Sequence, residues 1–177
     1  MTRVMEPEFV EINFVENSYM FGDLNKEEIE SLLFHGLIGR IGCHADGLTY
    51  VVPISYAYDG EYIYAHTIEG MKTRMMRKNP SICFEVDSLH DMANWQTVIG
   101  WGEFEELTDE NIRAAALKKL HERILPIVSS VTTHLSPDWP FAPSDFKAIK
   151  GVVFRVRLTK KTGKFENKSI PSFLTWG

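Results

Sequence analysis

A short basic stretch holds the residues best suited to bind a charged ligand. Residues 70–79 read GMKTRMMRKN and carry four of the nineteen Lys and Arg residues of a chain whose formal net charge is −5. The stretch is expected to form a short helix. Arg77 and Lys78 lie near its C-terminal end, where the helix dipole favours cations. Lys72 and Arg74 fall in the first turn, where the same dipole opposes each cation by about 0.3–1 kcal/mol.

An anion at the start of this helix would explain the two cations of the first turn. Free backbone amides and cationic side chains would then face the same ligand. A phosphate fits best, with Lys72 as a point charge and the hydroxyl of Thr67, at the end of the preceding strand, as a donor. The alternative is that Lys72 and Arg74 are solvated surface cations, because runs of charge usually lie on exposed faces. The pattern alone leaves both interpretations open.

Other reactive side chains show less pattern. The six histidines lack metal-ligand spacing such as HExxH, so no metal site is predicted. His66 differs from the others because it lies at a strand end directly before the basic stretch, which makes it the candidate catalytic residue. Cys43 and Cys83 alternate into strands and are expected to be small core residues rather than nucleophiles.

The composition limits the class of protein. A length of 177 residues suits a single domain spanning 1–177, and 44% hydrophobic with 24% charged residues is ordinary for a globular protein. The acidic balance argues against a nucleic-acid binder. No apolar run approaches the roughly 20 residues needed to cross a membrane, and MTRVMEPEFVE has no apolar region typical of a secretory signal. We therefore expect a cytoplasmic protein without a nucleic-acid or membrane partner.

The elements that position these residues change from helical to strand periodicity along the chain. The sequence LNKEEIESLLFHG predicts a first helix, with Asn25 and Glu28 as a capping box and Gly36 as its end. A long helix is expected from about Thr108 to Arg123, whose later cations suit the helix dipole. Strand patterns are found at residues 37–44, 48–58, 62–66, 81–87, 95–106 and 151–158.

Turn and breaker residues indicate how the strands are joined. Asp46-Gly47 and Asp59-Gly60 separate apolar runs and predict hairpins. Pro53 cannot donate to a strand ladder, so an edge or a bulge is expected there, and Gly100-Trp101-Gly102 predicts a bend or a close backbone approach. The sum is mainly β, with about six antiparallel strands and flanking helices. A small closed barrel is the natural architecture, because closure removes exposed edges.

The stretch IYAHTIEGMKTRMMRKNPSICFEV resembles the strand, loop and helix of the pyridoxamine 5′-phosphate oxidase-like split barrels, and is closest to the branch of the nitroimidazole-resistance flavoproteins. The segments LIGRIG, YVVPISYAYDGEYIYAH, WQTVIGWGEFEEL and VVFRVRLTKKTGK keep the family order. The resemblance covers roughly residues 24–165, leaving an N-terminal arm (1–23) and a C-terminal tail (166–177). It implies a six-stranded antiparallel split β-barrel of the FMN-binding type.

The resemblance also implies a homodimer with FMN at the subunit interface. Lys72 would hold the phosphate, with Arg74 in place of a second basic residue, because Met71-Lys72 stands where the oxidases carry Arg-Lys. His66 and Thr67 would lie along the phosphate and ribitol. Further cofactor contacts are implied at Pro53, Ile54 and Ser55, beside the isoalloxazine ring, and at Gln96 and Thr97 on a neighbouring strand.

Three functions follow as hypotheses. The first is an FMN-dependent oxidoreductase that passes electrons from a reduced nicotinamide to a small acceptor such as a nitroaromatic. The second is a haem-binding split barrel with His66 as a candidate ligand, and the third is a non-catalytic flavin carrier or sensor. Lys72 favours flavin over haem, since haem propionates do not need a helix N-terminus. Oxidation of pyridoxamine phosphate is not expected, because residues for its phosphate are not found near the C-terminus. The Pro-rich insert (136–146) and the tail are candidates to cover the flavin or the dimer interface.

Overall fold

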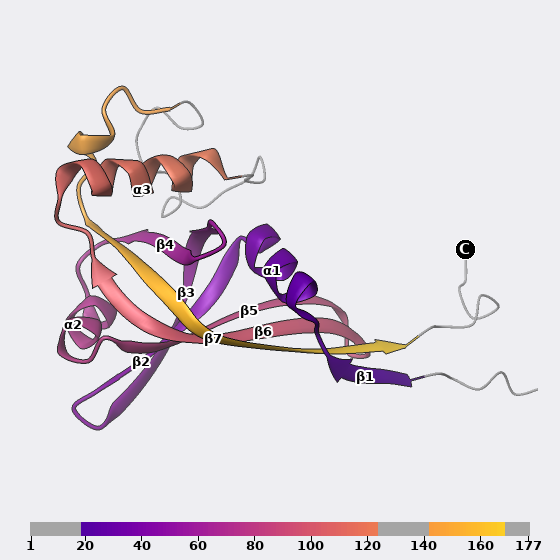
Figure 1. The fold of residues 1–177 in the computed structure, drawn as a ribbon. Coiled ribbons are helices and arrows are strands. Elements are labelled where there is room, and N and C mark those ends of the chain that lie inside the picture. The colour runs from indigo at the N-terminus through magenta and orange to yellow at the C-terminus, as the bar shows by residue number, and fades with distance from the viewer. Residues whose placement is uncertain (1–18, 124–141, 169–177) are drawn as a thin grey trace, which may run out of the picture.

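A computed structural model describes residues 19–123 and 142–168 of the chain. Within these residues seven strands form one sheet, accompanied by three α-helices and a 3-10 helix (Figure 1). The strands are β1 (Tyr19–Asp23), β2 (Ile38–Ala45), β3 (Leu48–Tyr58), β4 (Tyr62–Thr67), β5 (Ser81–Asp91), β6 (Asn94–Glu106) and β7 (Val152–Lys168). The helices are α1 (Lys26–His35), α2 (Met71–Lys78), α3 (Glu110–Glu122) and the 3-10 helix η1 (Phe146–Ala148).

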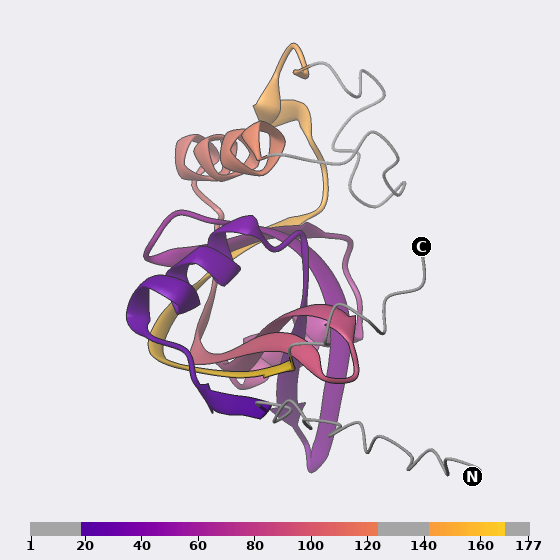
Figure 2. The same ribbon diagram turned by 90° about the vertical axis from the view of Figure 1, so that its right-hand side faces the viewer.

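The strands close into a ring. Their order is β1-β7-β4-β3-β2-β5-β6, and β6 pairs in addition with β7. The pairings between these strands are antiparallel. Figure 2 shows the ring viewed roughly along its axis, with α1 beside the ring and α3 outside it. The mainly β architecture with flanking helices is therefore confirmed. No helix in the described parts of the chain is long and apolar enough to cross a membrane.

The N-terminal arm and the last strand differ from the prediction. Part of the arm forms β1, which pairs with the end of β7 from Lys164 to Lys168. The final strand, expected to end at Leu158, therefore continues to Lys168. The second half of β7 is polar and lacks a clear alternation of apolar and polar residues. It is nevertheless a strand, because its backbone pairs with β6 on one side and β1 on the other. Residues 136–141 of the predicted insert and residues 169–177 of the predicted tail lie outside the described residues.

β3 changes partner along its length. It pairs with β2 from Leu48 to Ser55 and with β4 only from Tyr56 to Tyr58. Among the described strands, Pro53 is paired on one side only, opposite Arg40 of β2. The expected edge position of the proline is thus confirmed, because its missing N–H faces no ladder.

The two Asp-Gly hairpins use different turns. Asp46 and Gly47 have φ values of 52° and 76°, as a two-residue turn with both φ values positive requires. The second connection has three residues, and only Gly60 has positive φ, at 97°. There the carboxylate of Asp59 accepts hydrogen bonds from the N–H groups of Glu61 and Tyr62, at 3.1 and 2.9 Å. These hydrogen bonds from the Asp59 side chain stabilise the turn, so a second residue with positive φ is not needed.

The helices are fixed to the ring by buried side chains and caps. The predicted capping box of α1 is present: Asn25 Oδ1 accepts from the Glu28 N–H at 2.9 Å, and Glu28 Oε2 accepts from the Asn25 N–H at 2.8 Å. Leu33 of α1 and Met76 of α2 are fully buried in the main core. α3 packs against β4 in a second cluster, in which Leu117 is fully buried.

A close backbone approach occurs at Gly102, as the glycine pattern predicted. The register between β6 and β7 shifts between Trp101 and Gly102. A Cβ atom on Gly102 would lie 2.2 Å from the backbone oxygen of Arg157. Since a backbone atom cannot rotate away, only glycine fits here without moving a strand.

We expect Gly102→Ala to lower the free energy of unfolding by about 1–3 kcal/mol, the usual cost of overpacking. Urea unfolding followed by circular dichroism measures this change. Gly42→Ala is the matched control, because the nearest atom to its added Cβ lies at 3.6 Å, an ordinary contact. Equal losses in the two variants would contradict the close approach.

Candidate functional site

The loop between β4 and α2 is closed by one threonine. Thr73 is fully buried, and its hydroxyl accepts the Gly70 N–H at 3.0 Å and lies 2.9 Å from Glu69 Oε1. These contacts fold residues 68–70 back onto the first turn of α2. The end of β4 and the start of α2 are thereby held together, so Thr67 and Lys72 become neighbours.

The four cations of the basic stretch separate into two pairs. Arg77 forms ion pairs with Glu69 and Glu106, at 2.8 and 2.6 Å, and Lys78 pairs with Asp46 at 2.6 Å. Within residues 19–123 and 142–168, Lys72 and Arg74 form no such pair. The C-terminal cations of α2 therefore have structural partners, whereas the two N-terminal cations lack a counter-ion.

Lys72 is the more constrained of these two cations. It is half-buried, and its Nζ donates to Thr67 Oγ1 at 2.7 Å. Burial lowers the pKa of its ammonium group, because desolvation disfavours the charged form, and Cys43 opposes this change. Arg74 is exposed on another face of the helix, because side chains two positions apart do not face each other. It lines a shallow hollow of about 310 Å³ together with Met71 and Lys78, and its charge acts on Glu69.

The donor set at this point fits a phosphate. An ammonium group, a threonine hydroxyl and the first amides of α2 are donors of the kind that hold phosphate oxygens. The first turn of α2 itself contains no acidic residue, and the carboxylate of Glu69, which precedes the helix, is bound by Thr73 and Arg77. An anion would also offset the cost of the half-buried charge on Lys72.

His66 points to the other face of β4 from Thr67, because successive side chains alternate. Its Nε2 lies 2.7 Å from the carbonyl oxygen of Lys150, which can only accept. The neutral ring therefore carries its proton on Nε2, and Nδ1 is left as the acceptor. Burial lowers the pKa of His66, the Lys150 carbonyl opposes this change, and nearby Arg113 adds to the lowering.

The glycine next to Lys150 allows this contact. Gly151 has a φ of 106°, and a Cβ there would lie 2.6 Å from the Nε2 of His66. Its carbonyl oxygen accepts from Arg113 at 3.0 Å. The imidazole is thus held between β7 and the start of α3. As a haem ligand it would have only Nδ1 to offer, because Nε2 is engaged.

The remaining predicted contacts lie elsewhere on the sheet. Ile54 is buried in the core, whereas Ser55 is half-buried and its Oγ accepts from Arg123 Nη2 at 2.5 Å. Thr97 donates to Glu85 Oε1 at 3.2 Å, and Gln96 is exposed.

One chain does not bring all of the predicted contacts together. Pro53 is opposite Arg40, and Arg40 pairs with Glu85 at 2.9 Å, so Pro53 and Thr97 belong to one outer face of the sheet. Thr97 lies opposite Asp87, six residues beyond the start of β5, or roughly 20 Å along the strand. The start of β5 is the end nearer to α2. The predicted residues therefore form two groups, one around Lys72 and one around Thr97.

Arg123 was not predicted as a site residue. Arg123 lies directly after the end of α3, where the helix dipole alone is enough to explain a cation. The sequence therefore contained no sign of its contact with Ser55 on β3, 68 positions away. Within the described residues no group of three His, Cys, Asp or Glu side chains is arranged to hold a metal ion.

Comparison with known proteins identifies the family. The sequence profile described as pyridoxamine 5′-phosphate oxidase matches residues 25–165. The chain belongs to this family. The match includes both groups of predicted contacts, and it begins and ends close to the limits expected from the resemblance.

Individual relatives agree with this assignment. An FAD-binding protein of Mesorhizobium loti is 29% identical in sequence, with a TM-score of 0.63 over 84% of this chain and 99% of that one. A protein described as a 5-nitroimidazole antibiotic resistance protein, from Bacteroides thetaiotaomicron, is 20% identical and shares the fold, with a TM-score of 0.64 over 85% and 90% of the two chains. An uncharacterized protein of Rhizobium meliloti is 30% identical over 84 residues, which are 48% of this chain and only 56% of that protein.

The burial of His66 predicts a pH dependence of stability. Its pKa in the folded protein lies below the ordinary value of 6.5. As the pH falls, the unfolded chain therefore binds the proton first, and the contribution of His66 to stability is lost as the pH drops through 6.5 and below. We expect the free energy of unfolding to fall more steeply between pH 7.5 and 5.5 in the wild type than in His66→Gln. The same pH dependence of the free energy of unfolding in both proteins, measured by urea titration across this range, would contradict the lowered pKa of His66.

Proposed function

We propose that the protein is an FMN-dependent oxidoreductase that takes hydride from a reduced nicotinamide and delivers electrons to a small acceptor such as a nitroaromatic. One observation carries the proposal. In a member of the pyridoxamine 5′-phosphate oxidase family, a half-buried Lys72 without a counter-ion is held by Thr67 at the start of α2. A cofactor phosphate would supply the negative charge and the hydrogen-bond acceptors that suit this arrangement.

The choice of FMN follows from the number of donor groups for phosphate. The described residues offer one group of donors for phosphate, formed by Lys72, Thr67 and the first amides of α2, which suits a single terminal phosphate. The FAD-binding relative shows that a flavin with a second phosphate is bound elsewhere in the fold family. The two flavins share the ring, the ribitol and the first phosphate, so the same residues of this chain would hold that common part.

A homodimer is proposed from the separation of the two groups of contacts. A flavin held at Lys72 would reach residues equivalent to Gln96 and Thr97 on a partner subunit if the two chains meet across the outer face of β2, β3 and β6. That face exposes Ile38 and Val51, each at 60%, and Trp101 at 40%. Apolar side chains exposed together are typical of an interface.

The residues of this chain would bind and orient the cofactor, and the flavin, when bound, would supply the electron-transfer chemistry. Lys72 and Thr67 would fix the phosphate. β3 has no described partner on its β4 side before Tyr56, so its backbone at Pro53 to Ser55 offers hydrogen-bonding groups to the polar edge of a ring. His66, neutral above its lowered pKa, would accept a hydrogen bond at Nδ1 from a ribitol hydroxyl of the cofactor.

The visible spectrum of the purified protein tests the cofactor. We expect two flavin bands, and mass spectrometry of the acid-released compound should identify FMN. Release of FAD would replace FMN in the proposal, and a sharp Soret band would contradict the flavin function in favour of haem. With full flavin occupancy, the rate of NADH or NADPH oxidation in the presence of a nitroaromatic then tests the reductase activity. Absence of turnover with both donors would leave a flavin carrier.

Lys72→Ala tests the phosphate site. We expect it to weaken FMN binding by about 1.5–3 kcal/mol, the range for a hydrogen bond to a charged group, which corresponds to about 10- to 140-fold in Kd. Titration of the apoprotein followed by flavin fluorescence measures the change. Because the substitution removes a half-buried charge without a counter-ion, the stability of the apoprotein should not fall.

Lys78→Ala is the matched control for this titration. It removes the same charge from the same helix, but at a residue that is paired with Asp46. FMN affinity should stay within about twofold of wild type in this variant. Equal effects of the two substitutions would show that only the overall charge of α2 matters.

A further inference from the structure

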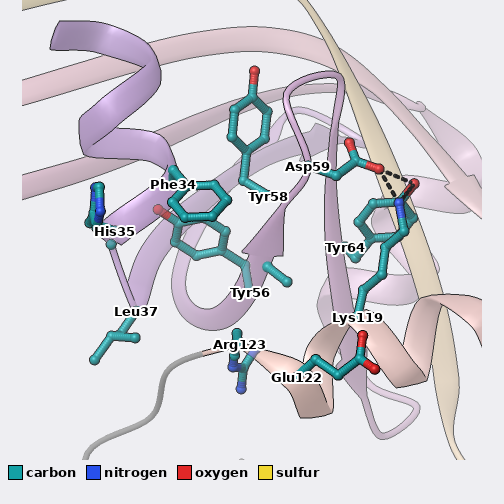
Figure 3. A pocket seen from close by; sticks show the side chains of 12 residues that line it. Phe34, His35, Leu37, Tyr56, Tyr58, Asp59, Tyr64, Lys119, Glu122 and Arg123 are labelled. Carbon is teal, nitrogen blue, oxygen red and sulfur yellow. Dashed lines mark hydrogen bonds and ion pairs between the residues drawn. The ribbon is translucent and has the colours of Figure 1, made fainter. Parts of the chain in front are cut away.

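A second cavity lies apart from α2, between the end of α1, the β3–β4 hairpin and the end of α3 (Figure 3). Its volume is about 710 Å³, within the range of roughly 300–1,000 Å³ typical of small-molecule sites. The wall is mainly aromatic and aliphatic, formed by Phe34, Leu37, Tyr56, Tyr58 and Tyr64. Phe34 is 62% exposed although it is a large aromatic side chain. The cavity thus offers apolar surface to a ring.

Arg123 lines this cavity with an incompletely paired guanidinium group. Its Nη2 donates to Ser55 Oγ, but Nε and Nη1 are buried without a hydrogen-bond partner among the described residues. Burial lowers the pKa of Arg123 to about 10, with a smaller opposing effect of Tyr56. Buried guanidinium N–H groups without acceptors are unfavourable, so an oxygen ligand here would be stabilising.

The charged residues of the cavity lining differ in how they are paired. Asp59 is matched by Lys119, which forms an ion pair with it, and by a hydrogen bond from Tyr64. Desolvation alone would raise the pKa of Asp59, but these contacts hold it at about 2. Its carboxylate therefore stays charged and is already bound by Lys119 and Tyr64. Glu122 is exposed and pairs with Lys118 at 3.6 Å. The lining thus holds two carboxylates and two cations, and Arg123 is the one of these four described residues that forms no ion pair.

We propose that this cavity binds a small aromatic carboxylate, with the carboxylate paired to Arg123 and the ring packed against Phe34 and the tyrosines. Nη2 carries two N–H bonds and uses one for Ser55, so a parallel pair of N–H groups remains on one edge of the guanidinium. A carboxylate matches such a pair with two hydrogen bonds. Arg123 as a residue is only half-buried, but its Nε and Nη1 are buried, so binding a carboxylate in the cavity requires a rotation of the guanidinium about the outer torsions of the side chain.

The proposal goes beyond the flavin function and does not require it. The cavity residues are distinct from Lys72, Thr67 and His66, and α2 lies apart from α1 and α3 (Figure 1). Binding can therefore be measured on the full-length protein as purified, with its cofactor content recorded and no electron donor added.

Benzoate and its neutral analogue benzamide are the probes, compared by isothermal titration calorimetry and ligand-observed NMR. We expect benzoate to bind at least tenfold more tightly than benzamide, because only the anion pairs with Arg123. In Arg123→Met the preference for benzoate should disappear, while benzamide binding should change by less than threefold. Arg123→Lys, which keeps the charge but loses the paired N–H edge, should retain a preference that is reduced several-fold.

Lys118→Gln is the control on the same helix, since Lys118 is exposed and lies outside the cavity lining. Its preference for benzoate should match wild type. Equal binding of benzoate and benzamide to the wild type, or an unchanged preference in Arg123→Met, would overturn the proposal. Displacement of benzoate by equimolar sulfate would also overturn it, because a bare anion site would not need the aromatic wall.

Discussion

The change of partner in β3 is the constraint on which the rest of the structure depends. The strand pairs with β2 up to Ser55 and with β4 from Tyr56 onward, so β4 separates from β3 just where the strand contains proline. The hydroxyl of Tyr56 donates to the carbonyl oxygen of Leu33 at 2.8 Å and fixes the end of α1 at this point. Because the edge of β3 is open on one side and anchored on the other, a ligand can approach its backbone without breaking the ring.

Within the described residues, cations that face a carboxylate differ from Lys72, Arg113 and Arg123, which are half-buried and form no ion pair. Arg113 has the carbonyl oxygen of Gly151 as its partner. Arg77, Lys78 and Lys119 each face a carboxylate, so their positions need no ligand. Lys72 and Arg123 instead contact threonine and serine hydroxyls, which accept a hydrogen bond but do not neutralise charge. Burying a cation against a neutral partner is costly. Both residues therefore indicate anionic ligands, at two separate places in the fold.

Local chemistry explains which features the sequence could predict. The capping box of α1, the Asp46-Gly47 turn and the edge position of Pro53 each depend on residues within a few positions, and all three are present. The strand β1 and the second half of β7 could not be recognised, because each is held by a partner far away in the sequence. For the site, the sequence separated Lys72 from the paired cations of α2 but missed Arg123, whose acceptor lies on another element.

α3 connects the two candidate sites physically. Near its start, Arg113 donates to the carbonyl of Gly151 beside His66, and just beyond its end Arg123 donates to Ser55 on the open edge of β3. Between them Lys119 binds Asp59 in the β3–β4 turn, so the helix is attached to both ends of β4. An anion that draws Arg123 into the aromatic cavity must weaken or lengthen its bond to Ser55. Since Ser55 belongs to the edge that would face the flavin ring, occupancy of the cavity would change the hydrogen bonding available there.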